Sequence, residues 1–143
     1  MVVNKVTDEI SVAPQITVED VAEIAAMGFK ALVCNRPDGE SFDQTGYDAI
    51  KAAAELHGLT SVFQPVLSGR MTIEDVAAFK EIFADAPKPV LAYCRSGTRC
   101  TFLWAFSQAG VLPTGEIIAA AGGAGYDISG MAPALEQLAA NRV

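Results

Sequence analysis

Short apolar runs alternate with longer amphipathic segments along most of the chain. Runs of strand length, bounded by turn-forming residues, predict strands at residues 10–12, 29–34, 60–64 and 90–93. Segments with helical character predict helices at residues 17–28, 47–57, 72–83, 99–108, 114–121 and 131–141. This alternation predicts a three-layer α/β fold, with a mainly parallel central sheet of four to five strands and helices on both faces.

The ends of the predicted elements indicate where reactive groups gather. Thr17 with Asp20, and Thr72 with Asp75, have the spacing of a capping box at a helix start. In parallel sheets, ligands and reactive side chains lie beyond the carboxyl ends of the strands. The loops that follow Cys34, residue 64 and the strand at 90–93 are therefore expected to meet. The glycine-rich residues 122–125 lack a preceding strand and a following Lys-Ser or Lys-Thr, so they are interpreted as a turn between helices.

Composition narrows the class of protein. The 143 residues, 51% of them hydrophobic, are enough for one domain spanning residues 1–143 with its own core. A formal net charge of -7 disfavours nucleic acid and anionic membrane surfaces as partners. No apolar run approaches the roughly 20 residues of a membrane span and no leader pattern is present, so a cytoplasmic protein is expected. The three cysteines form no CxxC pair, which favours free thiols without a metal or other cofactor.

The candidate chemistry lies in the loop between the strand at 90–93 and the helix that follows. Cys94 ends the strand, and residues 95–99 (RSGTR) lead into the helix, so several backbone N–H groups and a positive helix end surround one point. Such a loop binds an anion and lowers the pKa of a thiol, which makes Cys94 the predicted nucleophile. Arg99 supplies a planar set of donors for a tetrahedral oxyanion. Gly97 permits the turn, and Ser96 and Thr98 offer hydroxyl donors.

Four further residues have two interpretations each. Arg36 follows a strand end and either contacts a bound oxyanion or solvates its loop. Arg95 either faces the substrate or pairs with a carboxylate. Cys34 is either a core thiol or a resolving cysteine, and Cys100 is either buried packing or a redox partner of Cys94.

Several motifs resemble known families. Residues 93–99 (YCRSGTR) resemble the active-site loop of rhodanese sulfurtransferases and, with one residue fewer between Cys and Arg, that of protein tyrosine and dual-specificity phosphatases. Together with residues 11–15, 35–40 and 124–127, they make the chain similar to the beta-lactamase-hydrolase-like, phosphatase-like domain family. The resemblance implies a dual-specificity-phosphatase-like fold, a phosphatase or sulfurtransferase activity, and a sulfide-oxidation or persulfide dioxygenase module as a candidate partner. Cys100 departs from the pattern, because Ser is expected there.

Two features favour sulfur chemistry. Phosphatases of the resembled type separate Cys from Arg by five residues and carry an Asp general acid on a neighbouring loop, whereas here four residues intervene and residues 65–72 contain no Asp. The first hypothesis is therefore a sulfurtransferase that passes sulfane sulfur through a Cys94 persulfide. The alternative is a phosphatase that hydrolyses phosphoesters through a Cys94 phosphocysteine, with Asp38 or Glu40 moving in as the acid. A non-catalytic anion-binding or redox-sensing module is a third hypothesis.

Overall fold

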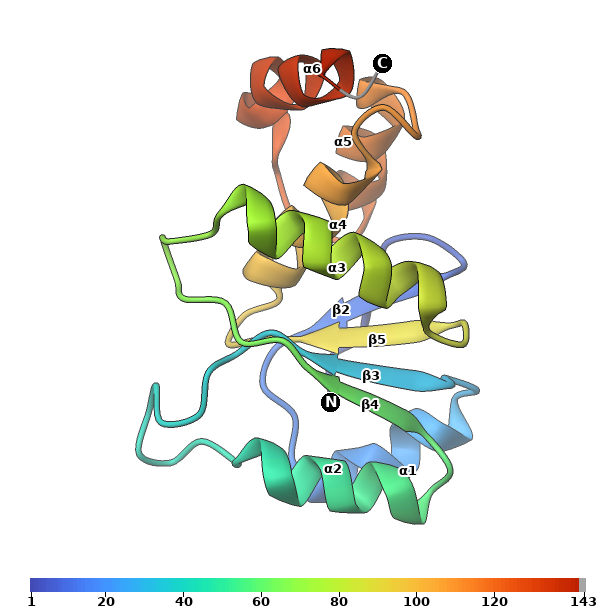
Figure 1. Cartoon of the computed structure of the whole chain (residues 1–143). Helices are drawn as coiled ribbons and strands as arrows, with labels where there is room; N and C mark the ends of the chain where they lie inside the picture. Colours follow the sequence, from blue (N-terminus) through green and yellow to red (C-terminus); the bar gives the residue numbers. More distant parts are fainter. Residues whose placement is uncertain (142–143) are drawn as a thin grey trace.

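A five-stranded sheet forms the centre of the protein. Figure 1 shows the computed structural model, which describes residues 1–141. The order across the sheet is β1-β2-β5-β3-β4, and only β1 runs antiparallel to its neighbour. The strands are β1 (Asn4–Lys5), β2 (Ile10–Ala13), β3 (Ala31–Cys34), β4 (Thr60–Phe63) and β5 (Val90–Tyr93). The predicted α/β fold with a mainly parallel sheet is confirmed.

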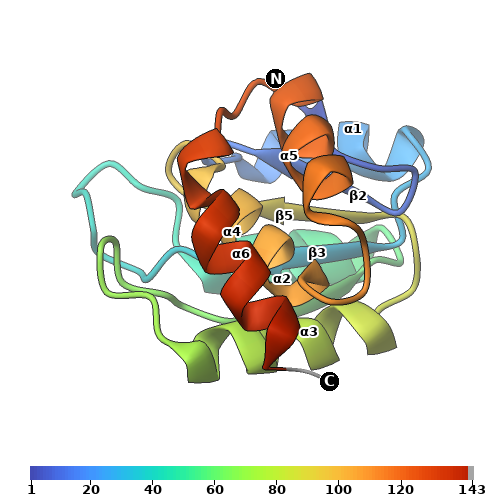
Figure 2. The same ribbon diagram turned by 90° about the horizontal axis from the view of Figure 1, so that it is seen from above.

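Helices cover both faces of this sheet, which completes the predicted three layers (Figure 1). One face carries α1 (Val18–Ala26) and α2 (Tyr47–Leu56). On the other side are α3 (Ile73–Asp85), α4 (Thr98–Gln108), α5 (Thr114–Gly123), the short 3₁₀ helix η1 (Ser129–Met131) and α6 (Ala132–Ala140). Seen from above, α6 lies over α4 on the outside of this layer (Figure 2).

Both predicted capping boxes are present and fix where α1 and α3 begin. The Thr17 side chain accepts from the Asp20 N–H, and the Asp20 carboxylate accepts from the Thr17 N–H at 2.9 Å. Thr72 and Asp75 make the same pair of bonds at the start of α3. Each box satisfies two backbone donors that a helix start otherwise leaves unpaired, and an N-cap of this kind stabilises a helix by about 1 kcal/mol.

Side-chain alternation along the strands divides the apolar interior into two cores. In β5, Val90 and Ala92 face the core beneath α3, α4, α5 and α6, whereas Leu91 faces the core against α1 and α2. The same period of two places Cys94, just beyond β5, in the first core and Cys34, at the end of β3, in the second. Cys100 on α4 also belongs to the first core. Two of the three thiols therefore share one side of the sheet.

The carboxyl ends of four parallel strands are in register. Ala13 pairs with Tyr93, Tyr93 with Cys34, and Cys34 with Phe63. The loops after β2, β3, β4 and β5 therefore leave the sheet at one edge. Three of these loops were expected to meet there; the loop after β2, which carries Gln15, joins them.

Some element boundaries differ from the sequence prediction. Gly122 and Gly123, expected in a turn, end α5, and the turn itself is made by Gly125 with φ of 100°. An Ala-rich helix tolerates two glycines at its end, because the backbone hydrogen bonds of the preceding turns are already formed. β1 has only two residues, one of them a lysine, and so lacks the apolar pattern on which strand prediction depends.

The helices are short by comparison with a membrane span. The longest of those described, α3, has 13 residues. Among residues 1–141, no helix combines the length and the apolar character needed to cross a bilayer.

Candidate active site

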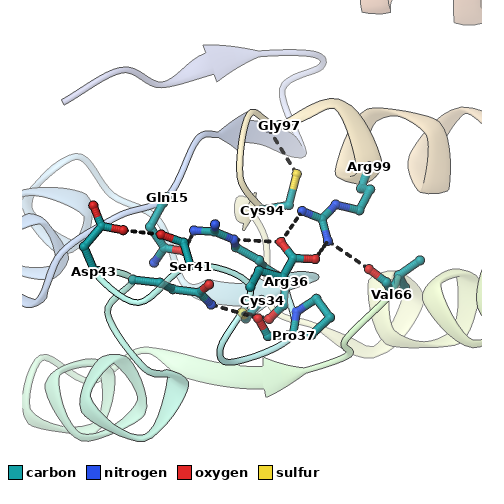
Figure 3. A network of polar contacts seen from close by, with 12 residues as sticks. Gln15, Cys34, Arg36, Pro37, Ser41, Asp43, Val66, Cys94, Gly97 and Arg99 are labelled. Carbon is teal, nitrogen blue, oxygen red and sulfur yellow. Dashed lines mark hydrogen bonds and ion pairs between the residues drawn. The ribbon is translucent and has the colours of Figure 1, made fainter. Parts of the chain in front are cut away.

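Cys94 lies where β5 ends and its loop turns back over the thiol. Its side chain is buried, and the N–H of Gly97 donates to its Sγ at 3.1 Å. The backbone N–H groups of Ser96 and Cys100 also favour the ionised sulfur and so lower the pKa of Cys94. Figure 3 shows the Cys94 sulfur inside the loop, where it accepts the hydrogen bond from Gly97. The predicted cradle of backbone donors is therefore formed around the sulfur atom itself.

This environment stabilises the thiolate of Cys94. The thiol of Cys100 donates a hydrogen bond to it, and together with the backbone donors it lowers the pKa of Cys94 to about 5, against the opposing effect of burial. At neutral pH, Cys94 is therefore ionised and nucleophilic.

The other two cysteines have the opposite character. Burial raises the pKa of Cys100 well above its ordinary value, so its thiol stays protonated and can donate to Cys94. Burial also raises the pKa of Cys34, whose Sγ donates to the carbonyl of Arg36 at 3.3 Å. Cys100 thus contacts the candidate nucleophile, while Cys34 sits on the other side of the sheet.

Gly97 allows the loop to close against Tyr126. It has φ of 89° and immediately precedes α4. A Cβ atom at this position would lie 2.2 Å from the Tyr126 hydroxyl. That hydroxyl donates to the carbonyl of Ser96 at 2.8 Å and accepts from the Asn4 side chain at 3.1 Å. Only glycine satisfies both the positive φ and the close approach of the tyrosine.

The Arg99 guanidinium is hydrogen-bonded through Nη1 and Nη2, and N–H donors remain on its Nε side. Nη1 donates to Glu40 at 2.7 Å and to the Val66 carbonyl at 2.9 Å, and Nη2 donates to Glu40 at 2.8 Å. A guanidinium has five N–H groups. The bonds among the described residues use both hydrogens of Nη1 and one of Nη2, which leaves Nε–H and the second Nη2 hydrogen. These two lie side by side and form the pair that binds an oxyanion at two points.

Glu40 links both arginines of the site. Its Oε1 also accepts from Arg36 Nε at 2.9 Å, and Arg36 Nη1 donates to the Gln15 side chain at 3.0 Å. The two guanidinium groups, Arg99 first, lower the pKa of Glu40, so this carboxyl is ionised at neutral pH. Figure 3 shows Arg36 and Gln15 next to the cysteine loop. Arg36 is buried and bound to Glu40 and Gln15, and its contact with an oxyanion stays a prediction.

The two carboxylates considered as mobile general acids are both engaged elsewhere. Glu40 is the ionised partner of Arg99, so it has no proton to give. Asp38 accepts the N–H of Tyr47 at 2.9 Å and so helps to begin α2. Neither is poised to protonate a leaving group.

The outer side of the loop borders an open pocket of about 380 Å³. Arg95, Ser96 and Thr98 are exposed along it, and the Ser96 and Thr98 hydroxyls are 3.0 Å apart. The remaining lining residues are Leu67, Ser68, Gly69, Met71, Arg99, Phe102 and Phe106. The pocket therefore joins the arginine side of the loop to an apolar wall. Within residues 1–141, no group of three or more His, Cys, Asp or Glu side chains is arranged to hold a metal ion.

Sequence reasoning did not predict the contacts that three residues make in this site. Glu40 was considered only as a mobile acid, and Gln15 and Tyr126 were noted only as parts of motifs. Each depends on contacts between distant segments: Glu40 and Arg99 are 59 positions apart, and Tyr126 and Ser96 are 30 apart. The signal that could have found them is the motif segments 11–15, 35–40 and 124–127 themselves, since all three converge on the cysteine loop.

Comparison with known proteins identifies the family. Residues 3–111 match the family described as beta-lactamase hydrolase-like protein, phosphatase-like domain. The chain belongs to this family. A beta-lactamase hydrolase-like protein of Xylella fastidiosa is 32% identical over 136 residues, and one of Agrobacterium fabrum is 34% identical over 105 residues. The chain spans about a third or less of the length of these curated relatives, 32% and 24% respectively.

Solved structures of phosphatase-like domains are similar over almost the whole chain. A candidate phosphatase from Neisseria meningitidis is 37% identical, with a TM-score of 0.85, and the match covers 96% of this chain and 99% of that one. The fold is shared with P. aeruginosa TpbA, solved in complex with phosphotyrosine, at 16% identity and a TM-score of 0.65, over 94% of this chain and 86% of that one. The dual-specificity-phosphatase-like fold is confirmed.

These relationships change the ranking of the two chemistries. The family is described as phosphatase-like and the 37% identical Neisseria meningitidis protein as a candidate phosphatase, which favours the phosphatase alternative. The sulfurtransferase hypothesis, ranked first from the spacing of Cys94 and Arg99 and from the absence of an Asp in residues 65–72, finds no support in them. Neither does a sulfide-oxidation partner. That ranking rested on the four-residue spacing and on the absence of an Asp from residues 65–72, and it did not include the arrangement of Glu40, Arg99 and the backbone donors.

Proposed function

We propose that this protein is a cysteine-dependent phosphatase that hydrolyses phosphate monoesters through a phosphocysteine at Cys94. The described chain would act as one catalytic domain, because α5 and α6 share the core that holds Cys94. The observation that carries the proposal is the arrangement of Arg99. Its end is fixed by Glu40 and Val66, so that Nε–H and one Nη2–H remain for a tetrahedral oxyanion beside an ionised thiol.

In the first step, the Cys94 thiolate attacks the phosphorus atom. A sulfur–phosphorus bond forms, the bond to the ester oxygen breaks, and the leaving group departs with the electron pair. Negative charge on the transferred phosphoryl group is stabilised by Arg99 and by backbone N–H groups of the loop. In the second step, water attacks phosphorus, inorganic phosphate is released and the thiolate is regenerated.

The low pKa of Cys94 serves both steps. A thiolate is the attacking species in the first step and a good leaving group in the second, because its negative charge is stabilised by the donors of Ser96, Gly97 and Cys100. Tyr126 holds the loop in this form through its bond to the Ser96 carbonyl. Arg95, Ser96 and Thr98 are proposed to contact the substrate from the pocket side.

The test is hydrolysis of an aryl phosphate by the wild-type protein and by Cys94→Ser, with thiosulfate-to-cyanide sulfur transfer measured alongside. We expect phosphate release that Cys94→Ser abolishes while the circular dichroism spectrum and melting temperature stay close to wild type. Sulfur transfer that depends on Cys94, without phosphate release, would restore the first hypothesis. Release that survives Cys94→Ser would remove Cys94 as the nucleophile.

A further inference from the structure

A second cavity lies next to the pocket at the cysteine loop. It has a volume of about 360 Å³ and lies between the start of α3, α4 and α6. Met71 and Phe106 line both cavities, so the two are neighbours on either side of these side chains. The rest of its lining is Thr72, Ile73, Val76, Ala134, Gln137, Leu138 and Asn141. We call this second cavity the α3–α6 groove.

The groove differs in character from the pocket next to it. The pocket contains two arginines, Arg95 and Arg99, whereas no residue lining the groove among those described is charged. Apolar side chains form most of its wall, and the ring of Phe106 stacks with Phe102 at a centroid distance of 6.1 Å. A ligand that spans both cavities would therefore be anionic at one end and apolar at the other.

Some of this apolar surface is left in contact with water. Ile73, at the rim of the groove, is 68% exposed, and Leu67, at the rim of the pocket, is 55% exposed. Apolar side chains gathered at the edge of a concave site are typical of a surface that a ligand covers.

The chemistry of the leaving group leads to the same ligand. None of the described residues that line either cavity is a carboxylic acid, and Asp38 and Glu40 are engaged with Tyr47 and Arg99. An ester that reacts here must have a leaving group that departs without being protonated. A phenolate is such a leaving group, and its ring is apolar.

We propose that the α3–α6 groove is a leaving-group subsite, and that the substrate is a phosphate monoester of a phenol that carries a further apolar group. This inference rests on the proposed phosphatase function. The phosphate binds at Arg99 and the loop, the ring passes between Met71 and Phe106, and the apolar extension lies against Ile73 and Leu138. Free aryl phosphates and phosphotyrosine followed by apolar side chains share this chemistry.

The first experiment compares phenyl phosphate with 4-biphenylyl phosphate, which adds one ring to the same leaving group. We expect kcat/KM for the biphenylyl ester to be about tenfold higher, because the second ring is removed from water in the groove. The same kcat/KM comparison is made for two phosphotyrosine peptides, one with leucine and one with glutamate after the tyrosine. It distinguishes phosphotyrosine followed by an apolar side chain from a free aryl phosphate as the source of the ligand. Equal kcat/KM for the two aryl esters would overturn the inference.

Filling the groove tests its location. Ala134 is exposed on α6 and lines the groove, so Ala134→Phe places a ring where the extension would lie. We expect the ratio of kcat/KM for the biphenylyl ester to kcat/KM for phenyl phosphate to fall from about ten to about one. The matched control is Ala52→Phe, an exposed alanine of α2 on the other face of the sheet, which should keep the preference of the wild type. A preference that survives Ala134→Phe would place the extension elsewhere and overturn the inference.

Binding to Cys94→Ser, measured by calorimetry, keeps the subsite testable even if neither ester is hydrolysed. The biphenylyl ester should bind about tenfold more tightly than phenyl phosphate, and Ala134→Phe should remove the difference. Absence of hydrolysis with this binding preference intact would overturn the phosphatase function and leave the subsite supported. Equal affinities would overturn the subsite. A wild-type dimer that Ala134→Phe dissociates, seen by light scattering, would show a second copy in the groove and also overturn it.

Discussion

Arg99 and Glu40 form a two-point ion pair, with Nη1 and Nη2 donating to the two carboxylate oxygens at 2.7 and 2.8 Å. The pair fixes the plane of the guanidinium, and with it the direction of the remaining Nε–H and Nη2–H donors. Only 22% of the Glu40 side chain is exposed, so solvent screens this pair less than an open surface pair. Glu40 is therefore a positioning residue for the proposed anion site.

Replacing this carboxylate tests the positioning role. Glu40→Gln keeps the shape of the side chain but leaves Arg99 and Arg36 facing a neutral amide. We expect kcat/KM to fall by about 100-fold, because a small displacement of a group that binds the transition state has an effect of this size. The free energy of unfolding, measured in urea, should fall by about 2 kcal/mol.

The pH profile of the same variant separates positioning from acid catalysis. If Glu40 only orients Arg99, kcat/KM should be lower at every pH while the shape of the profile is unchanged. Loss of the alkaline limb of the profile in Glu40→Gln would instead mean that Glu40 donates a proton to the leaving group.

The thiol of Cys94 should titrate far below an ordinary cysteine. Its pKa of about 5 compares with 9.0 for an unperturbed thiol, so the ultraviolet absorbance of the thiolate should appear through about pH 5. Cys100→Ala removes the S–H donor that stabilises the charged form, so it should raise the pKa of Cys94. Cys34→Ala is the control and should leave the midpoint in place, because Cys34 lies on the other side of the sheet. A midpoint near pH 9 in the wild type would contradict this description of the loop.

Gly97→Ala should damage both stability and activity. The new methyl group would meet the Tyr126 hydroxyl at 2.2 Å, and alanine is disfavoured at φ of 89°. We expect a loss of about 2 kcal/mol in the free energy of unfolding and a fall in kcat/KM. Gly115→Ala is the matched control, since no atom lies within 4 Å of a Cβ there. If Gly97→Ala and Gly115→Ala have equal stability and equal activity, the loop does not need glycine at position 97.

We predict that Cys100 also gives Cys94 a protected oxidised state. Hydrogen peroxide converts the Cys94 thiolate to a sulfenic acid with release of hydroxide, and attack by the Cys100 thiol then forms a disulfide with loss of water. Intact mass should fall by about 2 Da, and dithiothreitol should restore activity. In Cys100→Ser, oxidation should proceed to the irreversible sulfinic acid, while Cys34→Ser should behave as wild type. Irreversible oxidation of the wild type at the same rate as Cys100→Ser would contradict a resolving role for Cys100.

Local patterns were sufficient to predict most of the fold. The capping boxes of Thr17 and Thr72 and the apolar run at 90–93 each depend on residues close together in sequence, and each appears where it was predicted. The antiparallel strand β1 was not predicted, because two residues, Asn4 and Lys5, carry no periodic signal and pair only through contact with β2.

The sequence predicted the part of the candidate site that lies within one loop. Cys94, Gly97 and Arg99 are neighbours in sequence, so their types and order indicated an anion-binding loop. The partners that orient them, Glu40 and Tyr126, come from other loops, and their roles depend on the register of the strand ends. The ranking of sulfur over phosphate chemistry, which the comparisons do not support, relied on the four-residue loop and on the absence of an Asp from residues 65–72, and so on local features alone.

The most direct test of the account is the identity of the covalent adduct on Cys94. The protein is mixed with p-nitrophenyl phosphate, quenched in acid within milliseconds and analysed by intact and peptide mass spectrometry, with Cys94→Ser as the blank. The account predicts an adduct of about 80 Da on the peptide that contains Cys94, formed before steady-state phosphate release. Phosphate release with no such adduct, or an adduct of about 32 Da formed only from thiosulfate, would contradict it.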